Sequence, residues 1–175
     1  MKRFFGHIKT VCAHRHMVLR HCIKAGILWQ GLTHDLSKFS PTEFWVSVKN
    51  YQGYRSPCAK EREEKGHSLA WMHHKGRNKH HFEYWTDFSA KEHRTVPVEM
   101  PPKYLAEMFC DRLAASKVYK GESYTNASAK EYFLSEKNTI MMHPKTMEAL
   151  EGLFAILEKD GEEAAFEAVR RMLKK

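Results

Sequence analysis

The stretch with the clearest chemical potential is Gly31–Pro41, because it holds a histidine directly followed by an aspartate, His34 and Asp35. An imidazole and a carboxylate on neighbouring residues suit a borderline divalent cation such as Mn, Fe, Co, Ni or Zn, and two ligands leave positions open for others and for water. The same dipeptide also occurs on protein surfaces, since aspartate is rarely buried without a partner. The pair therefore predicts a metal site only if the chain supplies further ligands.

One further candidate lies on the first predicted helix, residues 4–25. Apolar residues at three- and four-residue steps define one face of this helix, which includes Phe5 and Leu19. At about 100° per residue, His16 falls on the same face, whereas His14 points to the opposite side. His16 is therefore predicted to face the core, either as a metal ligand or as a hydrogen-bonded core histidine.

A second candidate is Asp111, on the apolar face of a long helix that begins at Pro102. An ionised carboxylate on an apolar face is costly unless it is paired or bound to a cation. The sequence therefore predicts an internal cation beside Asp111. A salt bridge with a basic side chain such as Arg112 or Lys117 would satisfy it equally well.

The stretch Ser68–Trp85 contains two pairs of histidines on either side of a basic turn with a glycine. Such a turn can aim one imidazole of each pair inward, while the side chains between the pairs offer donors to an anion. The pairs are His73/His74 and His80/His81, and the donors are Arg77, Asn78 and Lys79. The turn at residues 75–81 could instead neutralise and stack on single-stranded nucleic acid, or simply be solvated.

Composition limits the class of protein. The chain has 175 residues, of which 42% are hydrophobic, which is enough for one domain with a real core. Its four cysteines are scattered, as expected for reduced thiols in the cytoplasm, and no segment resembles a secretory signal or a membrane span. The net charge of +8 favours anionic partners such as a nucleotide, a phosphorylated metabolite or nucleic acid.

The elements that must position these residues all read as helices. A short helix is expected to carry Leu28 to Phe39, including His34 and Asp35, and Ser40-Pro41-Thr42-Glu43 reads as a capping box that starts the next helix. Residues 144–175 are predicted to form amphipathic packing helices. No strand is predicted. The fold class is therefore all-α, with residues 1–175 as a single domain and the site drawn from residues 16–111.

The order of the candidates resembles a known signature. A histidine, then His34-Asp35, then a distant aspartate on a helical bundle is similar to the HD-domain superfamily of metal-dependent phosphohydrolases, and His34-Asp35-Leu36-Ser37-Lys38 resembles its His-Asp-x-x-Lys variant. The stretches Gly31–Phe44 and Ala70–Trp85 resemble more closely a family of uncharacterised bacterial and phage proteins, known only as a domain of unknown function. The short spacing between His16 and His34 departs from the superfamily and leaves the first ligand open.

The resemblance implies a set of site residues. One divalent ion would be held by His16, His34, Asp35 and Asp111, and a second ion, present in some branches, would add one histidine from each pair. For that second ion His74 and His80 are favoured, with His73 and His81 as alternates. Lys38 and Arg77, helped by Asn78 and Lys79, would bind substrate phosphate, and Glu83 would orient the attacking water.

The leading functional expectation is a metal-dependent phosphohydrolase that acts on a nucleotide or another phosphorylated small molecule. Two alternatives remain: a nucleic-acid-binding module that uses residues 75–81, and a non-catalytic helical bundle with a structural metal.

Overall fold

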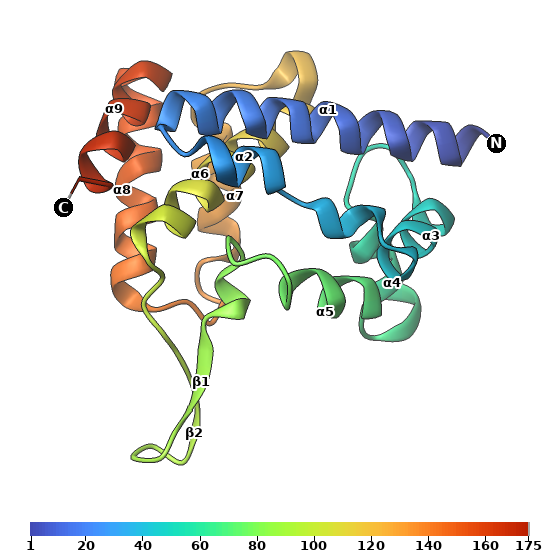
Figure 1. The fold of residues 1–175 in the computed structure, drawn as a ribbon, viewed down its shortest axis with the longest axis horizontal. Helices are drawn as coiled ribbons and strands as arrows, with labels where there is room; N and C mark the ends of the chain where they lie inside the picture. Colours follow the sequence, from blue (N-terminus) through green and yellow to red (C-terminus); the bar gives the residue numbers. More distant parts are fainter. Residues whose placement is uncertain (175) are drawn as a thin grey trace.

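The computed structural model describes residues 1–174, which form nine α-helices, three short 3₁₀ helices and one two-stranded hairpin (Figure 1). The α-helices are α1 (Lys2–Ala25), α2 (Leu28–Thr33), α3 (Pro41–Asn50), α4 (Pro57–Lys65), α5 (Leu69–Lys75), α6 (Pro102–Lys120), α7 (Ser128–Glu136), α8 (Pro144–Asp160) and α9 (Glu162–Met172). The 3₁₀ helices are η1 (Leu36–Phe39), η2 (Phe82–Tyr84) and η3 (Gly121–Ser123). The prediction of an all-α fold is confirmed, apart from the hairpin.

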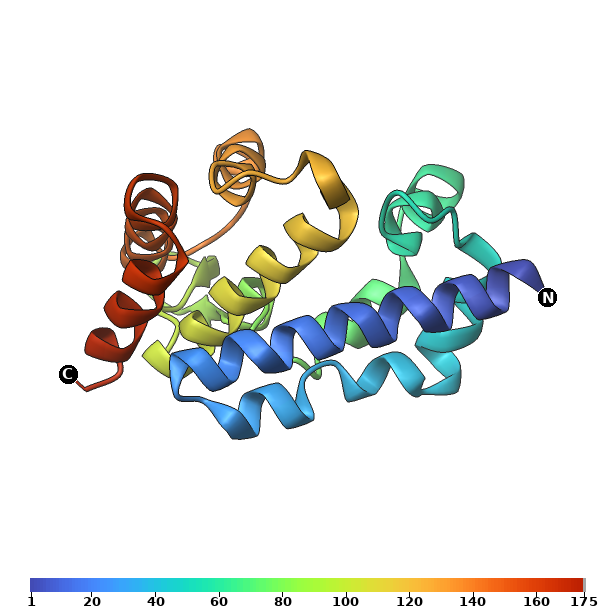
Figure 2. The same ribbon diagram turned by 90° about the horizontal axis from the view of Figure 1, so that it is seen from above.

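Helix α1 runs along most of the molecule, with α3 and α4 beside its beginning and α9 near its end (Figure 2). It ends at Gly26, whose φ of 79° is a left-handed conformation that glycine adopts without strain, and whose N–H bonds back to carbonyls of the last turn. A single straight element thus contacts both ends of the molecule.

The predicted face of α1 is wrong. Its buried residues are His7, Val11, His14, Val18 and His21, together with Cys22 and Ala25. Phe5 is exposed, as is His16. The reason is that histidines share the inner side with valines: His7 packs against the rings of Phe44 and Tyr51, and His14 faces Asp35 and Asp111.

The apolar core lies at the other end of the molecule, where α6 and α9 pack against α1 and α7 and α8 pack against α6. Its largest fully buried side chains are phenylalanines, with ring centroids 5.5 Å apart for Phe109 and Phe154 and 5.8 Å apart for Phe133 and Phe154. Aromatic side chains in such contact contribute strongly to folding, because each buries a large apolar area. This core fixes α6, and with it Asp111.

Helices α3, α4 and α5 pack differently. Among the described residues of these three helices, Ala70 is the only buried hydrophobic side chain. Polar contacts take the place of a core: the Ser68 hydroxyl, just before α5, donates to Glu61 Oε2 at 2.6 Å, and the Asn50 amide donates to the carbonyl of Val46. This end of the molecule therefore depends on hydrogen bonds and ion pairs.

The hairpin consists of β1 (Thr86–Ser89) and β2 (Arg94–Pro97), which pair antiparallel with Phe88 opposite Thr95. It extends away from the helices (Figure 1). Its two strands are only four residues long, too short for the alternation that predicts a strand from sequence. Within the described residues, none of the helices combines the length and apolar composition that a transmembrane segment requires.

Candidate metal centre

His34 and Asp35 lie at a sharp turn of the chain. Helix α2 ends at Thr33, and Asp35 adopts a left-handed conformation with φ 54° before η1 begins. Aspartate is among the few non-glycine residues that tolerate this conformation. The expectation that both residues sit within one short helix is therefore wrong. The chain changes direction between the two side chains.

Close packing of α2 on α1 brings this turn against His14. A Cβ atom at Gly31 would lie 2.8 Å from Cβ of Cys22 and 3.1 Å from Cα of Leu19, so any larger residue would push the two helices apart. The Arg15 guanidinium then donates to the carbonyl of His34 at 2.8 Å. The glycine of the His-Asp stretch thus sets the distance between the turn and α1.

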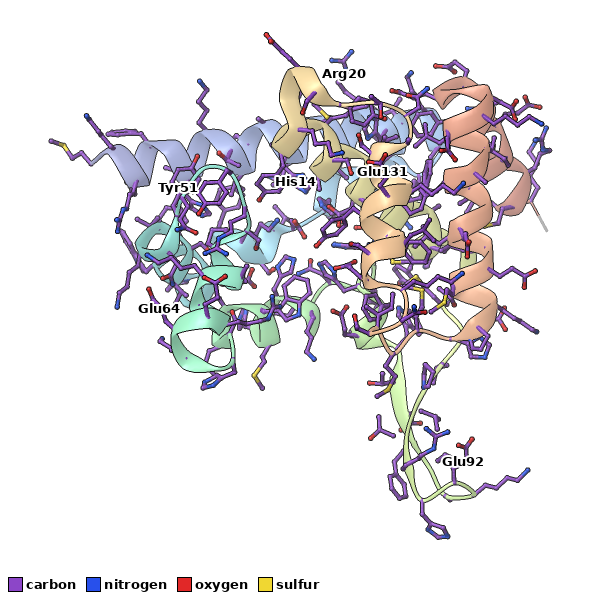
Figure 3. The ribbon with its side chains drawn as sticks, turned by 180° about the vertical axis from the view of Figure 1, so that it is seen from behind. His14, Arg20, Tyr51, Glu64, Glu92 and Glu131 are labelled. Carbon is purple, nitrogen blue, oxygen red and sulfur yellow. The ribbon has the colours of Figure 1, made fainter. Side chains whose placement is uncertain are left out.

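Four side chains from α1, this turn and α6 meet in a first group. His14 Nε2 lies 2.9 Å from Asp111 Oδ1, and His34 Nε2 lies 3.3 Å from Asp35 Oδ2 and 3.6 Å from Asp111 Oδ1. One ligand atom from each of the four residues lies within 4.8 Å of all the others. Figure 3 labels His14, on the side of α1 that faces the middle of the molecule. Residues far apart in sequence thus form one group that could hold a metal ion.

Asp35 also belongs to a second group, with His74, His80 and His81. Its Oδ1 lies 3.2 Å from His74 Nε2 and 3.5 Å from His80 Nε2. Because Oδ2 faces the first group and Oδ1 the second, this one carboxylate has a different oxygen for each. Asp35 could therefore supply a ligand atom to either group.

Two buried glutamates hold the outer nitrogens of these rings. Glu107 Oε1 lies 3.0 Å from Nδ1 of both His34 and His80, and Glu43 Oε2 lies 2.7 Å from Nδ1 of His74. A carboxylate on Nδ1 fixes the tautomer and directs Nε2 toward a cation. The prediction of Glu43 as a capping-box partner is wrong, because its carboxylate faces the histidines and Ser40 makes no side-chain cap. Glu107 was missed, although it lies one helical turn before Asp111.

Several buried polar atoms at the centre lie near oppositely charged groups but make no hydrogen bond of good geometry to the described residues. They are Nε2 of His14, His34, His80 and His81, and Oδ1 of Asp35. A buried polar atom without a partner costs roughly 1–3 kcal/mol, so native structures contain few of them. These atoms fall in both groups, with Nε2 of His14 and His34 in the first and the others in the second, and in each group they could become ligands of a divalent cation.

The charges are strongly coupled. Burial alone would raise the pKa of Asp35, but the cations around it, His34 and Lys38 foremost, hold that pKa well below its ordinary value. Burial lowers the pKa of His34, but Asp35, Asp111 and Glu107 together raise it well above the ordinary value. The carboxylates therefore stay ionised and need positive charge beside them, which protons or a metal ion can supply.

Lys38 is the most exposed of the charged side chains that contact Asp35. Its ammonium lies 2.6 Å from Asp35 Oδ2, and its side chain is 31% exposed, compared with 16% for Asp111 and 1% for Asp35. Burial lowers the pKa of Lys38, but Asp35 and Asp111 raise it above the ordinary value, so the side chain remains charged. A small anion that approaches the centre from this side would meet Lys38 first.

The predicted ligands are thus brought together, with one exception. His34, Asp35, Asp111, His74 and His80 belong to the groups described above, and so does the alternate His81. His16 is exposed, on a different face of α1 from His14, and is not part of them. The seven-residue spacing of His7, His14 and His21 was the signal that could have identified His14.

The remaining predicted residues lie around this centre. His73, the other alternate, bonds through Nδ1 to Glu43 at 2.6 Å, and Asn78 donates to the Ser37 hydroxyl and the His74 carbonyl, both at 2.8 Å. Arg77 and Lys79 line a groove that also reaches His80. Glu83 on η2 is half-buried, and burial raises its pKa. It is not part of the metal-binding groups, and its role in orienting water stays a prediction.

Comparison with known proteins gives a family without an assigned activity. No curated protein and no solved structure matches the chain. One family model covers α1 through most of α8, and so includes every residue of the two groups and both supporting glutamates. Its match spans residues 3–156, and the chain belongs to this family of unknown function (DUF5662).

Proposed function

We propose that this protein is a metal-dependent phosphohydrolase that acts on a nucleotide or another small phosphoester. The observation that carries the proposal is the meeting of buried Nε2 atoms of His14 and His34, which make no hydrogen bond of good geometry among the described residues, with the carboxylates of Asp35 and Asp111. The resemblance of His34-Asp35-Leu36-Ser37-Lys38 to HD-domain phosphohydrolases supports the same function. That resemblance is an analogy and fixes no substrate by itself.

The residues divide between two ion positions. His14, His34 and Asp111 would hold one divalent ion, His74, His80 and His81 a second, and Asp35 would contribute one oxygen to each. Imidazole and carboxylate ligands suit Mn, Fe, Co, Ni or Zn. When bound, such ions polarise a phosphoryl oxygen and make water a better nucleophile near neutral pH.

Other side chains would orient the histidines and bind the phosphate. Glu107 and Glu43 keep Nε2 of the histidines directed inward. Lys38 lies where a phosphate would enter, and its ammonium can move from Asp35 to a phosphate oxygen, which neutralises charge on the substrate. The net reaction consumes one water, breaks one phosphorus–oxygen bond, and leaves an alcohol and phosphate.

The test begins with elemental analysis of the purified protein and an assay of phosphoester hydrolysis with Mn, Co, Ni or Zn. We expect one or two transition-metal ions per chain and metal-dependent turnover. Asp35→Asn keeps the shape of the side chain but removes its charge, and should lose both metal and activity. Lys38→Ala should keep the metal and lose turnover, because an ammonium cannot be a metal ligand.

The outcomes separate the hypotheses. Wild-type metal content in Asp35→Asn would refute the site. Bound metal with no hydrolysis of any phosphoester, and melting that depends on the metal, would instead support a structural ion.

A further inference from the structure

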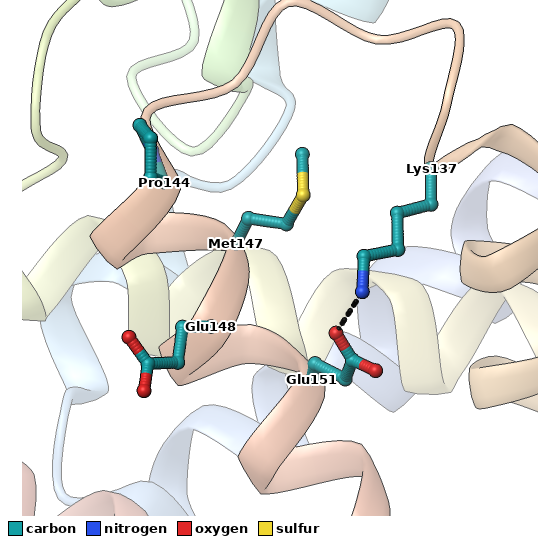
Figure 4. A pocket seen from close by; sticks show the side chains of 5 residues that line it. All are labelled: Lys137, Pro144, Met147, Glu148 and Glu151. Carbon is teal, nitrogen blue, oxygen red and sulfur yellow. Dashed lines mark hydrogen bonds and ion pairs between the residues drawn. The ribbon is translucent and has the colours of Figure 1, made fainter.

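Two depressions stand out on the described surface. One, of about 440 Å³, lies on α8 and is lined by residues such as Lys137 and Glu151, which pair with each other (Figure 4). Its one cation is paired with Glu151, and it contains no residue of the metal-binding groups. It offers little that would recognise a particular ligand.

The other depression, of about 360 Å³, differs in its chemistry. It lies between α2, the turn after α5 and the first turns of α6, and its lining includes Trp29, Arg77, Lys79, His80, Tyr104 and Glu107. We call it the Trp29 groove. Its volume falls within the range of small-molecule sites, about 300–1,000 Å³.

The Trp29 groove reaches the outer side of the metal-binding groups. Glu107, which is part of its wall, bonds to Nδ1 of His34 and His80, whereas Nε2 of both rings faces Asp35 and Asp111. The two nitrogens lie on different edges of an imidazole ring. A ligand in the groove would therefore contact Glu107, while an anion that enters beside Lys38 would contact the other edge of the rings.

The groove carries positive charge that the protein does not neutralise. Among residues 1–174, no carboxylate lies within ion-pair distance of Arg77 or Lys79. The Lys79 ammonium lies 5.6 Å from the ring centre of Tyr84 and 5.8 Å from that of Tyr104, which position it without removing its charge. Two cations at the rim thus remain available to an anion.

The groove also presents an aromatic surface. The side chain of Trp29 is 76% exposed on the six-residue helix α2, although burial of an indole would normally stabilise the fold. Gln30, next to it, adds an amide that can pair with the edge of a base. Aromatic faces beside basic side chains are the features with which proteins bind single nucleotides and short single strands.

We infer that the Trp29 groove binds a nucleoside monophosphate, with the base on the indole of Trp29 and the phosphate on Arg77 and Lys79. This site is distinct from the one at Lys38 and does not depend on the proposed hydrolysis. The phosphate lies at the basic rim, because Glu107 would repel it from the inner wall.

Binding is measured by calorimetry on the full chain as purified. The probe is the phosphonate analogue of AMP, in which a methylene group replaces the ester oxygen, so that an active metal centre cannot hydrolyse it. Trp29→Ala should weaken binding roughly tenfold, from the loss of one stacked base. Trp45→Ala, which removes an equally large exposed indole on α3, is the matched control and should leave binding unchanged.

Three further measurements locate the ligand. The double variant Arg77→Ala/Lys79→Ala should weaken the phosphonate about tenfold but leave adenosine unaffected, because adenosine has no phosphate. Lys38→Ala should change neither. A loss with Lys38→Ala would place the nucleotide at the metal centre, and unchanged binding in Trp29→Ala would show that the base does not lie on this indole; either result would overturn the inference.

An octathymidylate that binds far more tightly than the phosphonate, with steep salt dependence, would also overturn it, in favour of an extended nucleic-acid surface. The inference would also be overturned if none of the phosphonate analogues of the four ribonucleoside monophosphates bound. Metal content and phosphatase activity are measured on the same samples, so that failure here is distinct from failure of the proposed function.

Discussion

Helices α8 and α9 pack through phenylalanine and leucine side chains, whereas α3 and α5 meet through Glu43, His73 and His74. Apolar packing holds over a wide range of conditions, because it depends on buried area and not on charge. A contact between a carboxylate and imidazoles depends on protonation and on any ion they share. The two ends of the molecule should therefore respond differently to mutation, chelation and pH.

The largest expected effect is in the apolar end. Phe154→Ala should reduce the free energy of unfolding by about 3–5 kcal/mol, because it leaves a cavity among Phe109, Phe133 and their neighbours. The measurement is urea denaturation followed by circular dichroism. Chains that remain folded should keep their metal, and its loss would mean that the two ends are not independent.

Chelation should act mainly on the polar end. If the metal is present at about 100 times its dissociation constant, its removal withdraws about 2.7 kcal/mol of stabilisation from the elements it joins. We expect amide hydrogen exchange in α3 and α5 to accelerate by up to about 100-fold, and exchange in α8 and α9 to change little. If amide exchange accelerated equally in all of these helices, the two ends would unfold as one cooperative unit, and the proposed difference between them would be wrong.

His21 tests pH dependence in the apolar end. Its Nδ1 contacts the Cys110 carbonyl and its Nε2 contacts Lys117, an arrangement for neutral imidazole, and burial lowers its pKa to about 4. Between this value and about 6.5, the unfolded chain binds a proton that the folded chain does not, so stability falls as pH falls.

From pH 7 to 5 the free energy of unfolding of the wild type should fall by about 2 kcal/mol through His21. His21→Asn keeps a donor for the carbonyl but has no titrating imidazole, so its free energy of unfolding should fall by about 2 kcal/mol less than that of the wild type. Urea titrations of both proteins at the two pH values measure the difference. Parallel losses in both proteins would show that His21 is not the responsible group.

The smallest predicted effect is a change in metal affinity, caused by mutation of His14 on α1, the helix that contacts both ends of the molecule. His14→Ala should weaken metal binding by at least about tenfold, the scale for loss of a partner at a metal site, and His16→Ala should leave it unchanged. Competition with a metal-sensitive dye measures both. The pair is a matched control, because both histidines lie on α1 two residues apart, one buried and one exposed.

The same contrast explains which features the sequence could predict. In α8 and α9 the apolar side chains face inward, so periodicity predicts the packing helices correctly. In α1 the rule fails, because the polar side chains of His7 and His14 are buried while Phe5 is exposed. The grouping of His34, Asp35 and Asp111 was predictable from a motif. The shared supports Glu43 and Glu107 depend on tertiary contacts that no local pattern encodes.

The scarcity of buried apolar side chains in α3, α4 and α5 has a consequence for the protein in the cell. If the centre holds a metal ion, these helices should open more often when that metal is scarce and present cleavable backbone to proteases, while the phenylalanine core stays folded. The half-life of the chain would then follow the metal supply of the cell, so that protein made without its ion is removed before it accumulates.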